Sequence, residues 1–394
     1  MINSKYFAEA VHMDELRPGA INLANAPVGS GKTTWALETL PCTVSRPCKM
    51  VYLIDTRNGN TQLVLKHPRT AYYNDNRMEL VKDNSPWFGE AVHDNKIVVM
   101  TYAKFGVLAE KYHRFGYDFE LILCDEIHSL PKFRSFKDKK GGSNPHIAAQ
   151  KRLEEIVLKS NTLVIALSAT PRRAVEQINC PINTITVDED VRRLETKQII
   201  PYTNKFRLLE ELAPDDKGIV FISRITGMID FQKAATEKGF KAICVWSVNS
   251  IDHPMTKEQR EARNYIISHE QLPPQYDMVI VNASSETGIN IYGKVDYIVV
   301  HSQEEETQIQ IRGRYRQDLE RLYVLDYHSI NVPEEYLDCE LSAERREQLC
   351  YDVDIRDDKG RTYKWNTVKK RLIAAGYSVV ETRHNSKRFF IITL

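Results

Sequence analysis

The stretch that decides the fold is Ala26-Pro-Val-Gly-Ser-Gly-Lys-Thr-Thr34, which follows the short apolar run 20–24. Gly29 and Gly31 let the backbone curl so that successive N–H groups face a polyphosphate. In such a loop Lys32 reaches the terminal phosphates, and the Thr33 hydroxyl is a ligand for Mg²⁺. The stretch therefore predicts a site for ATP. The expected nucleotide-binding residues are those of the whole loop: Ala26, Pro27, Val28, Gly29, Ser30, Gly31, Lys32, Thr33 and Thr34.

A carboxylate pair further along the chain supports this interpretation. The apolar run Leu121-Ile-Leu-Cys124 leads directly into Asp125 and Glu126. We expect Asp125 to hold Mg²⁺ together with Thr33, and Glu126 to polarise the attacking water. The alternative, a glycine-rich turn that only happens to fit the loop pattern, does not explain these carboxylates. The pair predicts an ATP hydrolase.

Composition limits the class of protein. The 394 residues suffice for two or three domains, and 42% hydrophobic with 27% charged residues indicates a globular protein. Lys plus Arg (54) nearly equals Asp plus Glu (53), so the overall charge gives no information about a polyanionic partner, and only the local distribution of charge can. No apolar run is long enough to span a bilayer, and residues 1–6 lack the apolar core of a signal peptide. We expect a cytoplasmic protein without a membrane partner.

The seven cysteines are scattered through the chain. None forms a Cys-x-x-Cys pair with a second such pair downstream. Reduced, often buried thiols are therefore expected, rather than a zinc site or a disulfide framework.

Apolar runs of strand length recur along the chain and alternate with helix-length segments. After a short helical lead-in over residues 1–18, the first series lies at 20–24, 50–54, 96–102, 121–124 and 162–167. After a polar connection at 195–215, the second series lies at 219–222, 242–246, 278–281, 297–300 and 322–325. Continuous apolar strands of this kind are typical of parallel sheets covered on both faces. The pattern predicts two α/β domains in tandem, of which only the first has a phosphate-binding loop.

The last 36 residues are basic. Between Lys359 and Leu394 nine Lys and Arg residues face one acid, Glu381. Helical spacing over 365–375, a glycine at 376 and two strand-like runs, 379–383 and 388–393, predict a helix followed by a hairpin. This order is expected of a winged-helix-like module that grips duplex nucleic acid or docks a protein partner. A small cap whose lysines are only solvated is the alternative.

Taken in order, these landmarks resemble the motifs of the superfamily 2 helicases. The resemblance covers most of residues 20–330. The matching segments are the loop 26–34 (motif I), 55–62 (Ia), Thr101-Tyr102, Asp125-Glu-Ile-His128 (the DEAH or DExH form of motif II), Ser168-Ala-Thr170 (III), Phe221-Ile-Ser-Arg224 (IV), Ser285-Glu-Thr-Gly-Ile-Asn290 (V) and Gln310-Ile-Arg-Gly-Arg-Tyr-Arg316 (VI). The compact build looks like that of helicases carried by phages and mobile elements.

The resemblance implies two RecA-like domains that close over ATP, and it implies roles for particular residues. We expect RecA-like domains over 1–195 and 196–335 and a small basic α+β domain over 336–394. The implied catalytic residues are Lys32, Asp125, Glu126, Gln310, Arg314 and Arg316. His128, Gly288 and Asn290 join the loop in binding nucleotide. The implied nucleic-acid contacts are Arg57, Thr101, Arg224, Ser284 and Ser285, and for the arginines among them the alternative is an exposed salt bridge.

The sequence also departs from the family pattern. Motif V ends in Asn290 where Asp is usual, so a hydrogen-bonding side chain remains but its charge is lost. In motif VI the last arginine, Arg316, falls one position early, so Arg314, Arg316 or both are candidates for the arginine finger. No Q motif of the DEAD-box type precedes the loop, which leaves adenine selectivity unexplained.

These observations predict an ATP-dependent helicase or translocase that acts on nucleic acid and uses Mg²⁺, with DNA favoured over RNA. One alternative is an RNA helicase. Another is an ATPase that remodels protein–nucleic acid complexes without separating strands. A third is a P-loop kinase or switch protein. The third fits poorly with a second α/β layer that lacks a loop of its own.

Overall fold

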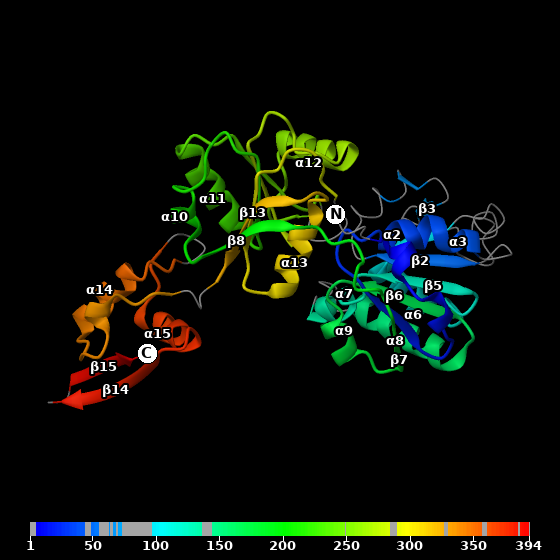
Figure 1. Ribbon diagram of the computed structural model, residues 1–394, viewed down its shortest axis with the longest axis horizontal. Helices are drawn as coiled ribbons and strands as arrows, with labels where there is room; N and C mark the ends of the chain where they lie inside the picture. Colours follow the sequence, from blue (N-terminus) through cyan, green and yellow to red (C-terminus); the bar gives the residue numbers. More distant parts are fainter. Residues whose placement is uncertain are drawn as a thin grey trace. The chain divides into compact units, whose positions relative to one another are not determined.

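A computed structural model gives the structure of the chain (Figure 1). It describes residues 5–43, 49–54, 63, 66–67, 70–72, 97–135, 144–248, 250–283, 290–326, 330–356, 361–384 and 387–393. Two compact units are present, the first built from Met1–Leu194 with Thr287–Asn290 and the second from Glu195–Glu286 and Ile291–Leu394.

The first unit is built on a seven-stranded sheet in which every pair of neighbouring strands is parallel. The strand order is β3-β4-β2-β5-β6-β1-β7, so the strand before the phosphate-binding loop lies next to β6. The strands are β1 (Ile21–Asn25), β2 (Met50–Ile54), β3 (Thr70–Tyr72), β4 (Ile97–Thr101), β5 (Leu121–Asp125), β6 (Leu163–Ser168) and β7 (Ile182–Ile185).

The apolar runs predicted as strands fill two cores, one on each face of this sheet. Along β2, Val51 and Leu53 contribute to one buried cluster, and Met50, Tyr52 and Ile54 contribute to the other. The same alternation holds along β4, β5 and β6. Successive side chains of a strand point to opposite faces, so a strand buried on both sides must be apolar throughout. The prediction of a parallel sheet covered on both faces is confirmed.

Helices cover both faces of the first sheet. They are α1 (Phe7–Ala10), α2 (Lys32–Thr34), the π-helical turn η2 (Trp35–Thr39), α3 (Leu40–Thr43), α6 (Tyr102–Lys111), α7 (Ser129–Lys132), α8 (Pro145–Lys159) and α9 (Arg172–Gln177), with 3₁₀ turns at Met13–Glu15 and Phe133–Ser135. Helices α6 and α8 pack closely at Gly106, where an added Cβ would lie 1.8 Å from the Pro145 carbonyl oxygen. Only glycine permits this approach.

The second unit contains a six-stranded parallel sheet with the order β10-β11-β9-β12-β13-β8. Its strands are β8 (Thr196–Tyr202), β9 (Gly218–Ile222), β10 (Ala242–Val245), β11 (Met278–Val281), β12 (Tyr297–His301) and β13 (Leu319–Leu325). Its helices are α10 (Lys205–Leu208), α11 (Ile225–Glu237), α12 (Lys257–His269) and α13 (Glu305–Arg314). The prediction of two tandem α/β layers with parallel sheets is therefore confirmed.

A small α+β region ends the chain. It contains the 3₁₀ turn η7 (Glu334–Tyr336), α14 (Ala343–Asp352), α15 (Trp365–Ala374) and the antiparallel hairpin β14 (Ser378–His384) with β15 (Lys387–Thr393). Leu337 and Leu341 form bridges to β15, which adds a short third chain segment to the hairpin. Gly376 has φ +98°, the left-handed conformation that ends α15. The predicted helix and hairpin are both present, with an apolar core of their own around Leu349, Val368 and Ile392.

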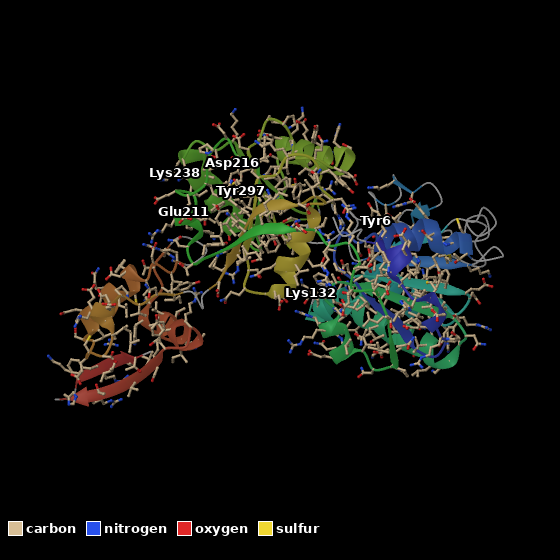
Figure 2. The ribbon with its side chains drawn as sticks, viewed as in Figure 1. Tyr6, Lys132, Glu211, Asp216, Lys238 and Tyr297 are labelled. Carbon is tan, nitrogen blue, oxygen red and sulfur yellow. The ribbon has the colours of Figure 1, made fainter. Side chains whose placement is uncertain are left out.

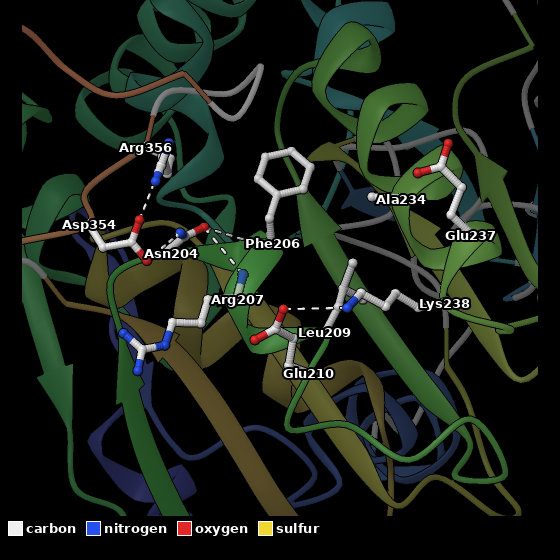
Figure 3. A pocket seen from close by; sticks show the side chains of 10 residues that line it. All are labelled: Asn204, Phe206, Arg207, Leu209, Glu210, Ala234, Glu237, Lys238, Asp354 and Arg356. Carbon is white, nitrogen blue, oxygen red and sulfur yellow. Dashed lines mark hydrogen bonds and ion pairs between the residues drawn. The ribbon is translucent and has the colours of Figure 1, made fainter. Parts of the chain in front are cut away.

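Polar contacts join this C-terminal region to the second sheet. The Asn204 side chain accepts hydrogen bonds from the first N–H groups of α10, and its amide donates to Asp354 over 3.0 Å. Arg356 donates to the same carboxylate over 2.7 Å. A cavity of about 620 Å³ opens beside these residues, between α10, α11 and the segment around Asp354 (Figure 3). Two ion pairs line it, one between Lys238 and Glu210 and the other between Arg356 and Asp354.

Within the described part of the chain, no helix combines the length and the apolar character needed to cross a membrane.

Candidate nucleotide site

The phosphate-binding loop follows the carboxyl end of β1 and is held there by its neighbours. The Ala26 N–H donates to the Ser168 carbonyl over 3.1 Å, which ties the start of the loop to the end of β6. Gly29 and Gly31 have φ of +81° and +100°, so both adopt the left-handed conformation that glycine permits. The loop ends in α2, which begins at Lys32.

Lys32 is folded back into the loop. Its side chain is 7% exposed, and its Nζ donates to the carbonyls of Ala26 (2.7 Å) and Pro27 (2.9 Å). A buried ammonium needs such acceptors because it is costly to leave uncompensated. A bound phosphate provides stronger, charged acceptors for the same group. The sequence-predicted lysine therefore lies inside the loop.

The segment before the loop clamps it, a feature that the prediction of a helical lead-in did not include. The Phe7 N–H donates to the Ser30 carbonyl over 2.9 Å, and the Tyr6 ring lies against Gly31. Tyr6, labelled in Figure 2, is 53% exposed. The Arg192 guanidinium lies over its ring and donates to its hydroxyl over 2.8 Å. No sequence signal distinguished this tyrosine from an ordinary surface residue.

Asp125 and Glu126 lie at the carboxyl end of β5, and each is 8% exposed. The Tyr102 hydroxyl donates to the Asp125 backbone carbonyl over 2.8 Å and so fixes the end of the strand. Glu126 has φ +48°, a left-handed conformation that is uncommon outside glycine and asparagine. Strained backbone of this kind is typical of functional sites.

Tyr52 connects the carboxylates to the loop. It is fully buried on β2, and burial together with the nearby Asp125 carboxylate raises its pKa well above the usual value. Thr33 and Glu126 also lie close enough to the Tyr52 hydroxyl to affect its pKa. Tyr52 on β2 therefore lies near Asp125, Glu126 and Thr33, and the nucleotide site that the sequence predicts from these residues stays a prediction.

His128, Ser168 and Thr170 form a buried network behind the carboxylates. His128 Nδ1 lies 3.1 Å from Ser168 Oγ and 3.3 Å from Thr170 Oγ1, and Ser168 Oγ accepts from the Thr170 N–H over 3.1 Å. Glu126 Oε2 lies 3.5 Å from the same His128 nitrogen. His128 is 1% exposed and Ser168 is fully buried. The structure thus brings together the segments 125–128 and 168–170, which lie on neighbouring strands.

The two arginines of α13 have different surroundings. Arg312 donates to the carbonyls of Tyr315, Glu195 and Gln317 and to the Thr196 hydroxyl, so its guanidinium holds the chain around the start of β8. Arg314 donates to the Gln310 side chain over 3.0 Å and to its carbonyl over 3.1 Å. Both are buried, with 8% and 6% exposure. Arg312 is a structural anchor, and Arg314 is held in place by Gln310.

The ends of motifs V and VI lie side by side in the second unit. The Ile291 N–H donates to the Arg314 carbonyl over 2.8 Å, and the Arg316 N–H donates to the Ile291 carbonyl over 2.9 Å. Arg316 therefore comes directly after a short β-bridge between Tyr315 and Ile291, and Ile291 is the residue after Asn290. The two candidate arginines therefore flank a bridge to Ile291, the residue that follows Asn290 in the chain.

The predicted nucleic-acid contacts are located only in part. The Thr101 side chain ends β4 and accepts from the Lys104 N–H over 3.1 Å, so it caps α6. Arg224 is exposed between β9 and α11, at the N-cap of that helix. The other predicted residues lie outside the described residues: Arg57, Ser284, Ser285 and the nucleotide-contact candidate Gly288.

The donor set beside the loop fits Mg²⁺. This ion prefers oxygen ligands, and it is usually bound through one or two carboxylates together with substrate phosphates and waters. Asp125 and Thr33 supply a carboxylate and a hydroxyl near one point, and the buried Tyr52 hydroxyl lies beside both. Among the described residues, no cluster of three His, Cys, Asp or Glu side chains forms a metal cage. The oxygens present suit an ion that arrives with nucleotide.

Comparisons with known proteins agree with this architecture. Residues 9–173 match the family model "Type III restriction enzyme, res subunit". No curated protein matches significantly. Among solved structures, the Mycobacterium smegmatis helicase Lhr bound to ssDNA and AMP-PNP has a TM-score of 0.51 at 14% identity, over 78% of this chain and 44% of that chain. This chain thus spans less than half the length of Lhr.

Two further structures show the same fold. S. cerevisiae Dbp5 bound to RNA and ADP BeF3 has a TM-score of 0.54 at 17% identity, over 78% of this chain and 80% of that chain. The DUF1998 helicase MrfA bound to DNA has a TM-score of 0.51 at 15% identity, over 94% of this chain and 55% of that chain. The family match of the first domain and the fold of the two α/β layers together confirm the resemblance to the superfamily 2 helicases.

Proposed function

We propose that this protein is an ATP-dependent helicase or translocase that couples ATP hydrolysis to movement on a nucleic-acid strand, with DNA favoured over RNA. One observation carries the proposal. The first unit joins a phosphate-binding loop to Asp125, Glu126 and a buried His128 network, and the second unit holds Arg314 on Gln310 without a loop of its own. Among the described residues, the loop and the carboxylates lie in the first unit and the α13 arginines lie in the second, and phosphoryl transfer uses both kinds of group.

In this proposal the first unit binds and activates the nucleotide. The backbone N–H groups of the loop and the Lys32 ammonium bind the phosphates, while Thr33 and Asp125 hold Mg²⁺. The ion neutralises charge on the phosphates when it is bound. Glu126 orients the attacking water and takes its proton. The Tyr6 ring, with Arg192 over one face, lies beside the loop where a nucleobase can stack.

The second unit supplies positive charge to the transferring phosphoryl group. Arg314 and Arg316 are the candidates, and Gln310 orients Arg314 through two hydrogen bonds. An arginine supplied in this way accelerates hydrolysis by on the order of a thousandfold or more. We propose that hydrolysis depends on closure of the two RecA-like domains, and that His128, Ser168 and Thr170 transmit closure to the strand.

Contacts to the strand are proposed at Arg57, Thr101, Arg224, Ser284 and Ser285. Contacts of this type go mainly to phosphates, so they give affinity without strong sequence choice. The Thr101 oxygen caps α6, but its hydroxyl proton stays available to a phosphate oxygen.

The preference for DNA rests on the C-terminal region, which we propose to be a separate module over 336–394. We name its basic surface the tail surface and define it by the exposed or half-exposed cations of α15 and the hairpin: Lys369, Lys370, Arg383, Lys387 and Arg388. Glu381 pairs with Arg383 and Arg388, whereas the lysines of this surface form no ion pair with any described residue. A helix and a hairpin that carry cations suit the phosphates of a duplex.

The experiment that tests the function is the steady-state ATPase rate with single-stranded DNA, duplex DNA, forked DNA and RNA added in turn, run beside a strand-separation assay. We expect single-stranded and forked DNA to stimulate hydrolysis and forked DNA to be unwound. Stimulation without strand separation on any substrate would favour the remodelling ATPase. Stimulation by RNA alone would favour an RNA helicase. A rate that no nucleic acid changes would contradict the proposal.

A further inference from the structure

The Tyr52 hydroxyl is a buried polar group for which the nucleotide chemistry above gives no role. Tyr52 lies in the middle of β2, and its side chain is 0% exposed. Among the described residues, no atom meets its Oη with the distance and angle of a full hydrogen bond, although Asp125 and Thr33 lie close enough to change its pKa. Buried hydroxyls are nearly always paired, so an exception in a native fold needs an explanation.

The strand register shows where this side chain points. Tyr52 lies opposite Leu123 on β5, and both side chains belong to the apolar cluster that includes Trp35 and Leu37 of η2. Asp125 comes two residues after Leu123, so by strand alternation its side chain lies on the same face. The Tyr52 ring therefore fills the space between the sheet and the helix that follows the phosphate-binding loop, with its hydroxyl near Asp125 and Thr33.

A second buried hydroxyl, in the phosphate-binding loop, has the same property. Ser30, in the phosphate-binding loop, is fully buried, and its Oγ has no hydrogen-bond partner within the described part of the chain. Two such groups at the loop and its carboxylate indicate a polar site whose hydrogen bonds are completed by a ligand.

We propose that Tyr52 is a positioning residue for the magnesium site, whose hydroxyl donates a hydrogen bond to the Asp125 carboxylate when Mg²⁺ and nucleotide are bound. The inference rests on the proposed function, because it assigns Asp125 to the metal. Carboxylates that bind metals are oriented by hydrogen bonds from such outer groups, and loss of one typically lowers metal affinity ten- to a hundredfold. Tyr52 is well suited, because a ring packed on all sides cannot turn its hydroxyl away.

The test is the substitution Tyr52→Phe, which keeps the ring and removes only the hydroxyl. A matched control is Tyr297→Phe. Tyr297 lies on β12 in the second unit, is also 0% exposed, and its hydroxyl likewise has no hydrogen-bond partner among the described residues. Both variants should fold with a thermal midpoint equal to or above that of the wild type, because each loses a buried hydroxyl that lacks a partner.

The readout is binding of a fluorescent AMP-PNP analogue, titrated with Mg²⁺ and repeated in EDTA. We expect Tyr52→Phe to raise the Mg²⁺ midpoint about tenfold, with unchanged binding in EDTA. Tyr297→Phe should match the wild type in both. In an Asp125→Asn background, Tyr52→Phe should have no further effect on the Mg²⁺ midpoint, because the charged acceptor is gone.

Three results would overturn the inference. They are a Mg²⁺ midpoint for Tyr52→Phe equal to that of the wild type, an equal loss of binding with Mg²⁺ and in EDTA, and a full effect of Tyr52→Phe in the Asp125→Asn background. Failure of the proposed function is distinct from these outcomes, because it would appear as a wild-type protein without Mg²⁺-dependent nucleotide binding.

Discussion

The two parallel sheets have the same design and carry different chemistry at equivalent places. In the first unit the turn from β1 to α2 contains Gly29 and Gly31 in left-handed conformations, so the backbone can wrap a phosphate. In the second unit the turn from β9 to α11 contains no glycine and is occupied by Ser223 and Arg224. The second unit instead carries two buried arginines, Arg312 and Arg314, on α13.

In the proposed function, this contrast divides one reaction between two copies of the same fold. The first copy offers N–H donors, a lysine and carboxylates, which suit binding of nucleotide and metal. The second offers two guanidinium groups that hydrogen bonds hold in place. Gln310 holds Arg314, and three carbonyl oxygens and the Thr196 hydroxyl hold Arg312. Variants that change nucleotide binding and the rate of hydrolysis separately therefore test this division.

The largest effect is expected in the first unit from Lys32→Ala. Without the ammonium, the loop no longer has a charged group on the terminal phosphates, so ATP affinity and hydrolysis should fall on the order of a hundredfold or more. Fluorescent-nucleotide titration and steady-state ATPase measure the two quantities. The matched control is Lys151→Ala, an exposed lysine on α8 of the same unit, which should change neither. Retained binding in Lys32→Ala would show that the loop does not hold the nucleotide.

In the second unit, Arg314→Ala and Arg312→Ala should have different effects. Arg314→Ala is expected to lower kcat on the order of a hundredfold or more with near-normal nucleotide binding, because the missing charge acts on the transition state. Arg312→Ala should mainly destabilise the second unit, by about 2–4 kcal/mol, since it leaves several buried carbonyls without donors. Pre-steady-state ATPase and thermal unfolding distinguish the two. A large loss of stability in Arg314→Ala with normal kcat would reverse their assignments.

A smaller effect is expected where the first unit couples hydrolysis to movement. Ser168→Ala removes the hydroxyl that contacts His128 and the Thr170 N–H. We expect the number of base pairs opened per ATP hydrolysed to fall roughly tenfold, because nucleotide state is transmitted less well to the strand. Parallel unwinding and ATPase assays give this ratio. An unchanged ratio, with both rates reduced together, would show that the network serves only the chemistry.

The smallest effect is expected on the tail surface. Replacing Lys369, Lys370 and Arg388 with Gln should lower duplex DNA affinity about five- to tenfold at low salt. The slope of log affinity against log salt concentration should become shallower by about one for each phosphate that is no longer neutralised. Lys233→Gln, an exposed lysine on α11, is the control. If affinity and its salt dependence are the same in wild type, variant and control, the C-terminal region is a cap rather than a grip on duplex.

The layers and the loop could be predicted because the physics that forms them is local. A strand buried on both faces must be apolar, and a loop that wraps phosphate needs glycine at fixed positions, so β1, β5 and residues 26–34 are visible in the chain. The C-terminal hairpin was equally visible, because a glycine and two strand-like runs limit it. These predictions used only residues close together in sequence.

Contacts between distant residues could not be predicted in this way. Arg312 and Arg314 look alike in the sequence, and only the folded chain brings Glu195 and Thr196 within reach of Arg312. The clamp of Phe7 on Ser30 depends on a helix whose position is fixed by the whole sheet. The surroundings of the Tyr52 hydroxyl could not be predicted either. A tyrosine in an apolar run is expected in the core, and the sequence does not show which groups lie near its hydroxyl.

The proposed motor requires that one triphosphate draws the two units together. Energy transfer can report this movement, between dyes on cysteines introduced at Asp118 of the first unit and Glu261 of the second, both exposed, in a background without the exposed Cys42. We predict that Mg²⁺–AMP-PNP with single-stranded DNA changes the transfer efficiency in the wild type and fails to do so in Lys32→Ala. An efficiency that nucleotide leaves unchanged, or that shifts equally in both proteins, would contradict closure of the units on ATP.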